Sequence, residues 1–145
     1  MSHRPGEEAQ YKRLPKYPHM KPADVTIWER YIDTNPDAYD SVIYDLAVGA
    51  GAPVDENLEN YVKRDIKYLT QRKIDVVGRK NGEIHIIEVK PNAGPSAFGQ
   101  VLAYAELYKR YISATEKIAM IVITDASRPD MENVAAELKI KLIAV

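Results

Sequence analysis

The sequence contains no cysteine, only one phenylalanine and one tryptophan, and no long apolar run. Without cysteine the chain cannot form disulfide bonds, use a thiolate nucleophile, or bind zinc or an iron–sulfur cluster through sulfur. None of its apolar runs approaches the roughly 20 residues that a transmembrane helix requires. The first 22 residues also lack the apolar region of a secretory signal, so the default expectation is a cytoplasmic protein without membrane contact.

What the sequence does contain is typical of one globular domain. At 145 residues, with 46% hydrophobic and 28% charged residues, the chain is long enough to bury a core of its own. Residues 1–22 carry four prolines and few aliphatic side chains, which predicts an extended or mobile N-terminal segment. Residues 23–145 are expected to form a single domain, since no internal repeat divides them.

Hydrophobic spacing and turn residues predict alternating helices and strands. A helix is expected from Ala23 to the residue before Pro36, followed by a β-branched strand in SVIYDLAVGAG. Residues 55–70 fit helical spacing but could also extend the next strand. The remaining predicted elements are, in order, strands 72–79 and 83–90 around an Asn-Gly turn, helix 96–112, strand KIAMIVITD, helix RPDMENVAAELKI and strand KLIAV. This order predicts an α/β fold with a mixed sheet.

Positive charge is unevenly distributed along the chain, although the net charge is only −1. Seven basic residues lie on or beside the predicted hairpin, namely Lys63, Arg64, Lys67, Arg72, Lys73, Arg79 and Lys80. Such a run is either an ordinary solvated face or a surface that holds the phosphates of a nucleic acid. Because the run adjoins the acidic residues described next, both interpretations stay open.

The predicted hairpin carries charged side chains at one end of an otherwise apolar strand pair. Because side chains alternate along a strand, Glu88 and Lys90 share a face with Ile84 and Ile86. The partner strand can place Asp75 on the same face and near the same end. Burying these charges unpaired would cost several kcal/mol per ion. A divalent cation would compensate both carboxylates, and oxygen ligands at this density suit Mg²⁺ or Mn²⁺.

These groups together predict the hydrolysis of a phosphodiester bond. A metal held by two acids and one backbone carbonyl keeps several waters, one of which can act as the nucleophile while the metal polarises a phosphoryl oxygen. Lys90 would orient this water, help to deprotonate it, or stabilise the developing negative charge.

The following helix offers two more polar groups. Gln100 and Tyr104 are four residues apart, so both side chains can reach the same place. An amide and a phenol there could contact a phosphate oxygen, a bound water or the lysine. The alternative is that Tyr104 belongs to the core, in one stripe with Val101, Tyr108 and Tyr111.

The dipeptide ID ending at Asp75 and the tripeptide EVK ending at Lys90 resemble the signature of the PD-(D/E)XK nuclease superfamily. The stretch QVLAY on the next helix is similar to the Q-x-x-x-Y motif of its RecB-like branch. The resemblance implies a restriction-endonuclease-like α-β-β-β-α-β core, with a mixed central sheet flanked by helices. It also implies a Mg²⁺- or Mn²⁺-dependent nuclease that acts on DNA and leaves 5′-phosphates.

The resemblance also implies roles for individual residues. Asp75 and Glu88 would bind the metal, Val89 would offer its carbonyl oxygen, and Lys90 would be the catalytic lysine, assisted by the glutamine and tyrosine of QVLAY. Ile74 stands where the signature has proline. The sequence carries no helicase motif, so a helicase or another replication or recombination protein would be a partner in trans.

The resemblance also implies a further metal-binding acid on the first helix, and a buried acid on the first strand could take the same place. Glu29 on the helix and Asp45 on the strand are equal candidates, and Asp45 could instead pair with Arg72 or Lys73. Asp24 is interpreted as a first-turn acid that interacts favourably with the helix dipole.

Two other features suggest no site of their own. His3, His19 and His85 do not form a ligand set, and strand parity turns His85 away from Glu88. The stretch AVGAGAP lacks the lysine and the spacing of a phosphate-binding loop.

The sequence therefore predicts a single-domain DNA nuclease, with two alternatives. One is a dimeric, structure-selective endonuclease similar to Holliday-junction resolvases, and a homodimer is plausible in either case. The other is a DNA- or protein-interaction module that keeps the fold without catalysis.

Overall fold

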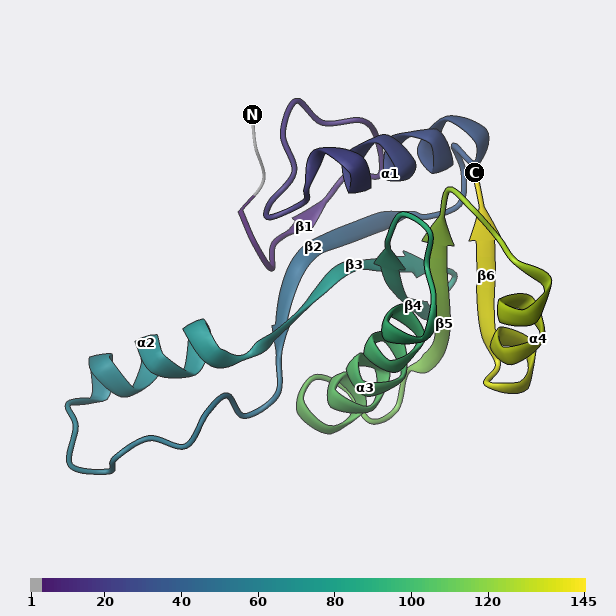
Figure 1. Ribbon diagram of the computed structural model, residues 1–145. Helices are drawn as coiled ribbons and strands as arrows, with labels where there is room; N and C mark the ends of the chain where they lie inside the picture. Colours follow the sequence, from purple (N-terminus) through teal and green to yellow (C-terminus); the bar gives the residue numbers. More distant parts are fainter. Residues whose placement is uncertain (1–3) are drawn as a thin grey trace.

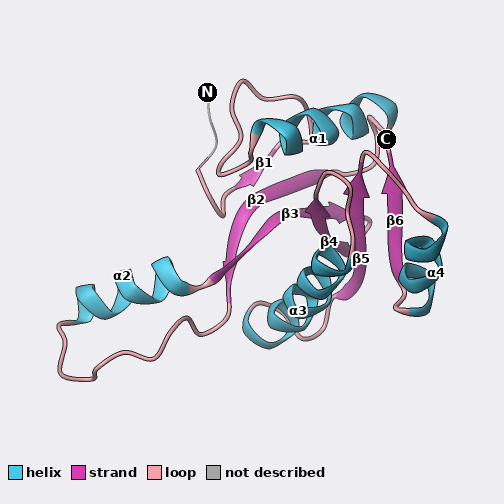
Figure 2. Cartoon of the chain, in the orientation of Figure 1, coloured by secondary structure: helices cyan, strands magenta, loops and turns pink. Residues whose placement is uncertain are grey.

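The computed structural model describes residues 4–145, so His3 lies outside the described part. Within that part the chain forms an α/β fold, in which helices lie against a mixed sheet (Figure 1, Figure 2). The elements are β1 (Glu8–Ala9), α1 (Pro22–Thr34), β2 (Ser41–Val48), α2 (Asn60–Thr70), β3 (Arg72–Lys80), β4 (Glu83–Val89), α3 (Pro95–Tyr111), β5 (Lys117–Thr124), α4 (Pro129–Glu137) and β6 (Ile140–Ala144). None of these helices combines the length and apolarity needed to cross a membrane.

The strands lie in the sheet in sequence order, from β1 to β6. Strands β1 to β4 pair antiparallel, and the β3–β4 hairpin turns through Asn81 and Gly82, which both have positive φ angles of 51° and 75°. Two consecutive positive φ angles fit a tight hairpin turn and explain why Asn-Gly marks it in the sequence. Strands β4, β5 and β6 pair parallel, because α3 and α4 carry the chain back between them.

Two apolar layers cover the two faces of the sheet. On one face α1 and the N-terminal segment pack around Trp28, whose ring nitrogen donates a hydrogen bond to the Tyr44 hydroxyl at 2.9 Å. On the other face α3 packs through Phe98 and Val101, and α4 contributes Ala135 to the same core. Figure 1 shows α1 and α3 on opposite sides of the sheet. The single tryptophan and the single phenylalanine of the chain therefore anchor different layers.

The N-terminal segment is extended, as predicted, but it packs against the domain instead of extending freely from it. β1 pairs with β2, and Ala9 and Tyr17 are buried. The Tyr11 hydroxyl donates a hydrogen bond to the carbonyl oxygen of Asn35 at 2.7 Å. The sequence suggested mobility because aliphatic residues are scarce there. Tyrosine rings supply the buried apolar surface instead.

On β2 and β3 the regular alternation of side chains between the two faces of the sheet is interrupted at one level. On β2, Tyr44 packs in the α1 layer while Leu46 packs in the α3 layer, although they are two residues apart. On β3, Val76 and Ile74 differ in the same way. The residue between Tyr44 and Leu46 is Asp45, which has a φ angle of 53° inside a strand. A left-handed residue breaks the regular alternation, so the sheet twists sharply at this point.

Beyond this twist the chain leaves the body of the domain. Residues 49–71, here named the α2 projection, run out from the end of β2, form α2, and return to β3 (Figure 1). None of the α2 residues is buried. The ambiguous stretch 55–70 is therefore helical only from residue 60, and it lies outside both cores.

The other boundaries lie close to those predicted. The largest differences are at β2, which ends at Val48 instead of residue 51, and at α4, which ends at Glu137 instead of residue 140. Lys139 adopts a φ angle of 58°, which ends the helix, and Ile140 already belongs to β6. Glycine usually occupies such a position, so a lysine there gave no signal in the sequence.

Candidate active site

Asp75 and Glu88 lie side by side across the β3–β4 hairpin. The backbone N–H of Asp75 donates a hydrogen bond to Glu88 Oε1 at 3.3 Å, and the N–H of Val89 donates one to Asp75 Oδ2 at 3.1 Å. The antiparallel register of the hairpin, in which Val76 faces Ile87, makes the two acids neighbours. The pair that the alternation pattern predicted is therefore present.

Glu88 is buried and Asp75 is partly buried, and their environment disfavours negative charge. Burial, followed by the negative charge of Asp75, raises the pKa of Glu88 to about 9, while the nearby Lys90 acts in the opposite direction. Burial also raises the pKa of Asp75, and the charges of Asp24 and Asp45 add to this effect. The pair therefore binds a proton at neutral pH, and it would also accept a different cation.

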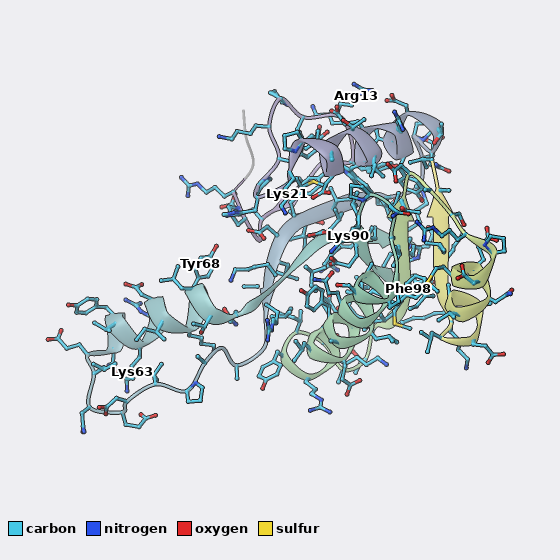
Figure 3. All side chains as sticks on the ribbon, viewed as in Figure 1. Arg13, Lys21, Lys63, Tyr68, Lys90 and Phe98 are labelled. Atoms are coloured by element: carbon cyan, nitrogen blue, oxygen red, sulfur yellow. The ribbon has the colours of Figure 1, made fainter. Side chains whose placement is uncertain are left out.

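A cleft of about 510 Å³ opens beside the pair. Its lining residues are His19, Lys21, Ala23, Asp24, Asp75, Glu88, Val89, Lys90, Pro91 and Gln100. Figure 3 shows Lys90 just beyond the end of β4, between α1 and α3. Neither Asp75, Glu88 nor Lys90 forms an ion pair with any residue from 4 to 145. Their charges therefore remain available to a ligand in the cleft.

The helix α3 brings Gln100 and Tyr104 toward the same place. Gln100 lines the cleft directly. Burial and the negative charges of Glu88 and Asp75 raise the pKa of Tyr104, so this phenol lies within electrostatic reach of both acids. Tyr104 also packs against the α3-side core, as the alternative interpretation proposed. The two interpretations are compatible, because the apolar ring of Tyr104 can pack against the core while its hydroxyl stays near the two acids.

Glu29, one of the two candidates for a further metal ligand, lies outside the cleft. It accepts a hydrogen bond from the Tyr17 hydroxyl at 3.0 Å, and it lies 3.5 Å from the Arg13 guanidinium in a separate cavity. Helix geometry explains this, since five residues rotate a side chain by about 140° from Asp24. Asp24 itself lines the cleft, which its interpretation as a first-turn acid did not anticipate.

Asp45, the other candidate, lies next to the acid pair. Only 6% of this residue is exposed, and its Oδ2 atom accepts no hydrogen bond within residues 4–145. Burial raises the pKa of Asp45, while His19, whose Nε2 atom lies 3.4 Å from Oδ2, and Lys73 act in the opposite direction. His19 itself lines the cleft and lies beside this buried acid.

His85 lies apart from the site, as predicted. Its ring nitrogens interact with the Tyr39 hydroxyl and the Glu83 carboxylate, each at 2.9 Å. Both partners are remote from the acid pair, so His85 has a structural role in the hairpin.

The oxygen donors of the site suit a small, hard cation. Residues 4–145 contain no group of three or more His, Cys, Asp or Glu side chains that could hold a metal ion. The site instead offers one close pair of carboxyl groups, Asp75 and Glu88. Their raised pKa values indicate that the protein supplies too little positive charge to stabilise both carboxylates. Mg²⁺ commonly uses one or two carboxylates and keeps its remaining ligands as water. The donor set therefore fits Mg²⁺ or Mn²⁺ with a largely hydrated shell.

The seven basic residues of the predicted surface do not lie together. Lys63, Arg64 and Lys67 are on α2, while Arg72 and Lys73 begin β3. The remaining two, Arg79 and Lys80, are at the other end of β3, about 25 Å from its start.

Three of these basic residues also have acidic neighbours. Arg79 pairs with Glu116 at 3.5 Å and Lys80 pairs with Asp40 at 3.4 Å, both at the hairpin end of β3. On the projection, Lys63 pairs with Glu56 at 3.3 Å. Only Arg72 and Lys73 lie near the site, because their charges act on Tyr104 and Asp45 respectively.

Comparisons of the chain with protein-family models, with curated proteins and with solved structures find no match. The chemistry of the cleft is a buried carboxylate pair with an unpaired ammonium, an amide and a phenol around it. Such a site can hold a hydrated divalent cation and neutralise an anionic ligand beside it.

Proposed function

We propose that this protein is a metal-dependent nuclease that hydrolyses DNA phosphodiester bonds, with the restriction-endonuclease-like core of the RecB-like PD-(D/E)XK enzymes. The observation that carries the proposal is the meeting of Asp75 and Glu88 in a cleft that also contains Lys90. Each carboxyl group accepts a backbone hydrogen bond, but neither has an ion-pair partner within residues 4–145, although placing acidic groups in a desolvated position without one costs stability.

In this proposal Asp75 and Glu88 hold the cation, and the Val89 carbonyl is the backbone ligand that the sequence resemblance implies. When bound, Mg²⁺ or Mn²⁺ supplies the Lewis acidity that phosphodiester hydrolysis needs. The raised pKa of Glu88 supports this role. When both carboxylates are charged they repel each other, and a divalent cation bound between them would compensate both charges.

The surrounding side chains bind and orient the substrate. The Lys90 ammonium lies beside Glu88, where it can neutralise charge that develops on the phosphate and donate hydrogen bonds to the attacking water. Gln100 can donate from its amide to a phosphate oxygen in the cleft. The Tyr104 hydroxyl, which stays protonated because its pKa is raised, can donate a second hydrogen bond.

Arg72 and Lys73 would hold the adjoining backbone phosphates. They begin β3, three and two residues before Asp75, so they lie within about 10 Å of it along the strand. Contacts of this kind give an affinity that does not depend on sequence and falls as the salt concentration rises.

A cleavage assay tests the proposal. Wild-type protein is incubated with linear, circular and branched DNA in the presence of Mg²⁺, Mn²⁺ or EDTA. We expect cleavage with either metal and none with EDTA. Asp75→Asn should lower the rate at least about 100-fold, since it removes a direct metal ligand.

Glu29→Gln is the matched control, because Glu29 is an acid of the neighbouring helix that lines a different cavity. Its rate should stay within about twofold of wild type. A wild-type protein that is inert on every substrate with both metals would overturn the proposal.

A further inference from the structure

His19 and Asp45 are two residues of unusual backbone conformation that contact each other beside the cleft. His19 has a φ angle of 54° and Asp45 one of 53°, and Asp45 lies inside a strand. Left-handed backbone is uncommon outside glycine, and it gathers where the fold positions a functional side chain. His19 Nε2 lies 3.4 Å from Asp45 Oδ2, although the two residues are far apart in the chain. The two unusual positions therefore belong to one feature.

Asp45 is a buried acid that His19 is placed to pair with. Its side chain is only 8% exposed, and Oδ2 accepts no hydrogen bond within residues 4–145. A buried carboxylate without a partner is unfavourable. Lys73 also acts on Asp45, but its ammonium already donates to the carbonyl oxygens of Tyr68 and Gln71. The imidazole of His19 is therefore the group that can satisfy Oδ2.

The rest of the His19 ring is open to the candidate active cleft. The side chain is 72% exposed, and the residue lines the cleft. Nδ1 takes part in no hydrogen bond or ion pair within residues 4–145. Lys21, Lys90 and Asp24 line the same cleft, so an anion beside the ring meets two ammonium groups and one carboxylate besides the acid pair (Figure 3). A ligand in the cleft can therefore reach the ring where it is exposed.

A ring held in this way fits a phosphate group. A charged imidazole carries one N–H donor on each nitrogen. Nε2–H can donate to Asp45 while Nδ1–H donates to a phosphate oxygen, so that one cation lies between two anions. The 3.4 Å contact is longer than a good hydrogen bond, and a ligand that fixes the exposed ring can close it. A cationic ligand would instead compete with the imidazole for Asp45.

We propose that His19 is a phosphate-binding residue of the cleft, and that Asp45 is the positioning residue that holds its imidazole. In the proposed nuclease the bound group is a DNA backbone phosphate beside the scissile bond. That assignment to DNA rests on the proposed function, whereas phosphate binding by the pair does not. The role gives the buried carboxylate on β2 a partner without a metal ion.

Nuclear magnetic resonance of the histidine rings tests the pair without any cleavage. The full chain in EDTA, at about pH 6 where an ordinary imidazole is mostly charged, is titrated with inorganic phosphate. Sodium chloride at equal ionic strength is the reference. We expect phosphate alone to shift the ring signals of His19, which His19→Asn assigns. The His85 ring should not shift, because Tyr39 and Glu83 hold it away from the cleft.

Asp45→Asn gives the decisive comparison, because two explanations predict opposite results. If Asp45 only adds negative charge near the cleft, neutralising it should strengthen phosphate binding. If Asp45 holds the imidazole, neutralising it should weaken phosphate binding at least about fivefold, since a charge-assisted hydrogen bond is lost. Asparagine tolerates left-handed backbone, so the strand is kept. Lys16→Gln is the matched control: it removes a charge from a different cavity and should change the affinity less than about twofold.

The cleavage assay adds a separate readout. On one DNA substrate with saturating Mg²⁺, His19→Asn and Asp45→Asn should each raise KM about tenfold and change kcat less than about threefold. The double variant should raise KM no further than either single variant, because the two residues act through one contact.

A His19 ring that phosphate does not shift would overturn the inference. An Asp45→Asn protein that binds phosphate as tightly as wild type, or more tightly, would overturn it too. The same holds for a His19→Asn protein that loses Mg²⁺ binding, since His19 would then serve the cation. Phosphate binding by the pair in a protein that cuts no DNA would support the inference and count against the proposed function alone.

Discussion

Two neighbouring regions of the β2–β3 strand pair present opposite anomalies. Near Asp75 the sheet buries charged groups without ion-pair partners, and at the α2 projection the same two strands lead into apolar groups that remain exposed. Globular proteins normally do neither, so a buried charge and an exposed apolar patch are the informative departures. The comparison teaches that the chain concentrates desolvated acidic groups and exposed apolar side chains in adjoining but separate regions of one continuous structure.

The largest expected difference between the two regions is in catalysis. Lys90→Met removes the ammonium from the cleft, and we expect the cleavage rate to fall about 10² to 10⁴-fold. Arg64→Met removes a positive charge from α2 and should change the rate by less than about threefold. Initial rates on one DNA substrate with saturating Mg²⁺ check this contrast. Equal losses for both variants would mean that the cleft has no special role.

The next difference is in stability. Ile74→Ala deletes a fully buried side chain of the α3-side core and should cost about 2–5 kcal/mol of unfolding free energy. Leu69→Ala alters a side chain that is 77% exposed and should change that energy by less than about 0.5 kcal/mol. Urea unfolding at low protein concentration measures both. A large cost for Leu69→Ala there would show that the projection packs within one chain.

A smaller effect should come from metal binding without substrate. Mg²⁺ at about one hundred times its dissociation constant should raise the unfolding free energy of wild type by about 2.7 kcal/mol. Asp75→Asn should lose this stabilisation, whereas Glu29→Gln should retain it. Thermal unfolding with and without Mg²⁺ provides the measurement. Equal stabilisation of all three proteins would place the cation somewhere other than the cleft.

The smallest effect should be the pH dependence of the metal-free protein. Burial raises the pKa of Glu88 from its ordinary value of 4.5 to about 9, so the folded state holds a proton that the unfolded state releases. This contribution to stability is complete below pH 4.5 and is lost as the pH rises toward 9. In EDTA, Glu88→Gln should therefore gain several degrees in melting temperature over wild type between these limits. A difference in melting temperature between Glu88→Gln and wild type that does not change with pH would contradict the raised pKa of Glu88.

Local periodicity was sufficient to predict the centre of the site. The alternation of Ile84, Ile86 and Glu88 placed the carboxylate on an inward face, and the Asn-Gly turn fixed which residue lies across from it. The spacing of Gln100 and Tyr104 placed both on one side of α3. These predictions depend only on neighbours within one strand pair or one helix.

The rim of the site could not be predicted in this way. Asp24 and His19 reach the cleft because α1 and the N-terminal segment pack across the end of the sheet, and no local pattern encodes that placement. Glu29 was chosen because the family resemblance implies an acid on the first helix, but helix rotation turns it into another cavity. Similarly, the helical spacing of residues 60–70 gave no sign that the helix leaves the core.

The exchange of faces at the level of Asp45 governs how the protein could vary in sequence. Alternate side chains of each strand pack in the α1 layer on one side of this level and in the α3 layer on the other. An inserted or deleted residue within β2 or β3 would therefore turn every side chain beyond it to the opposite face of the sheet. Residues 49–71 belong to neither layer, so lengthening that excursion costs little. Evolution or design can therefore change how far residues 49–71 extend from the sheet while the cleft beside Asp75 and Glu88 stays in place.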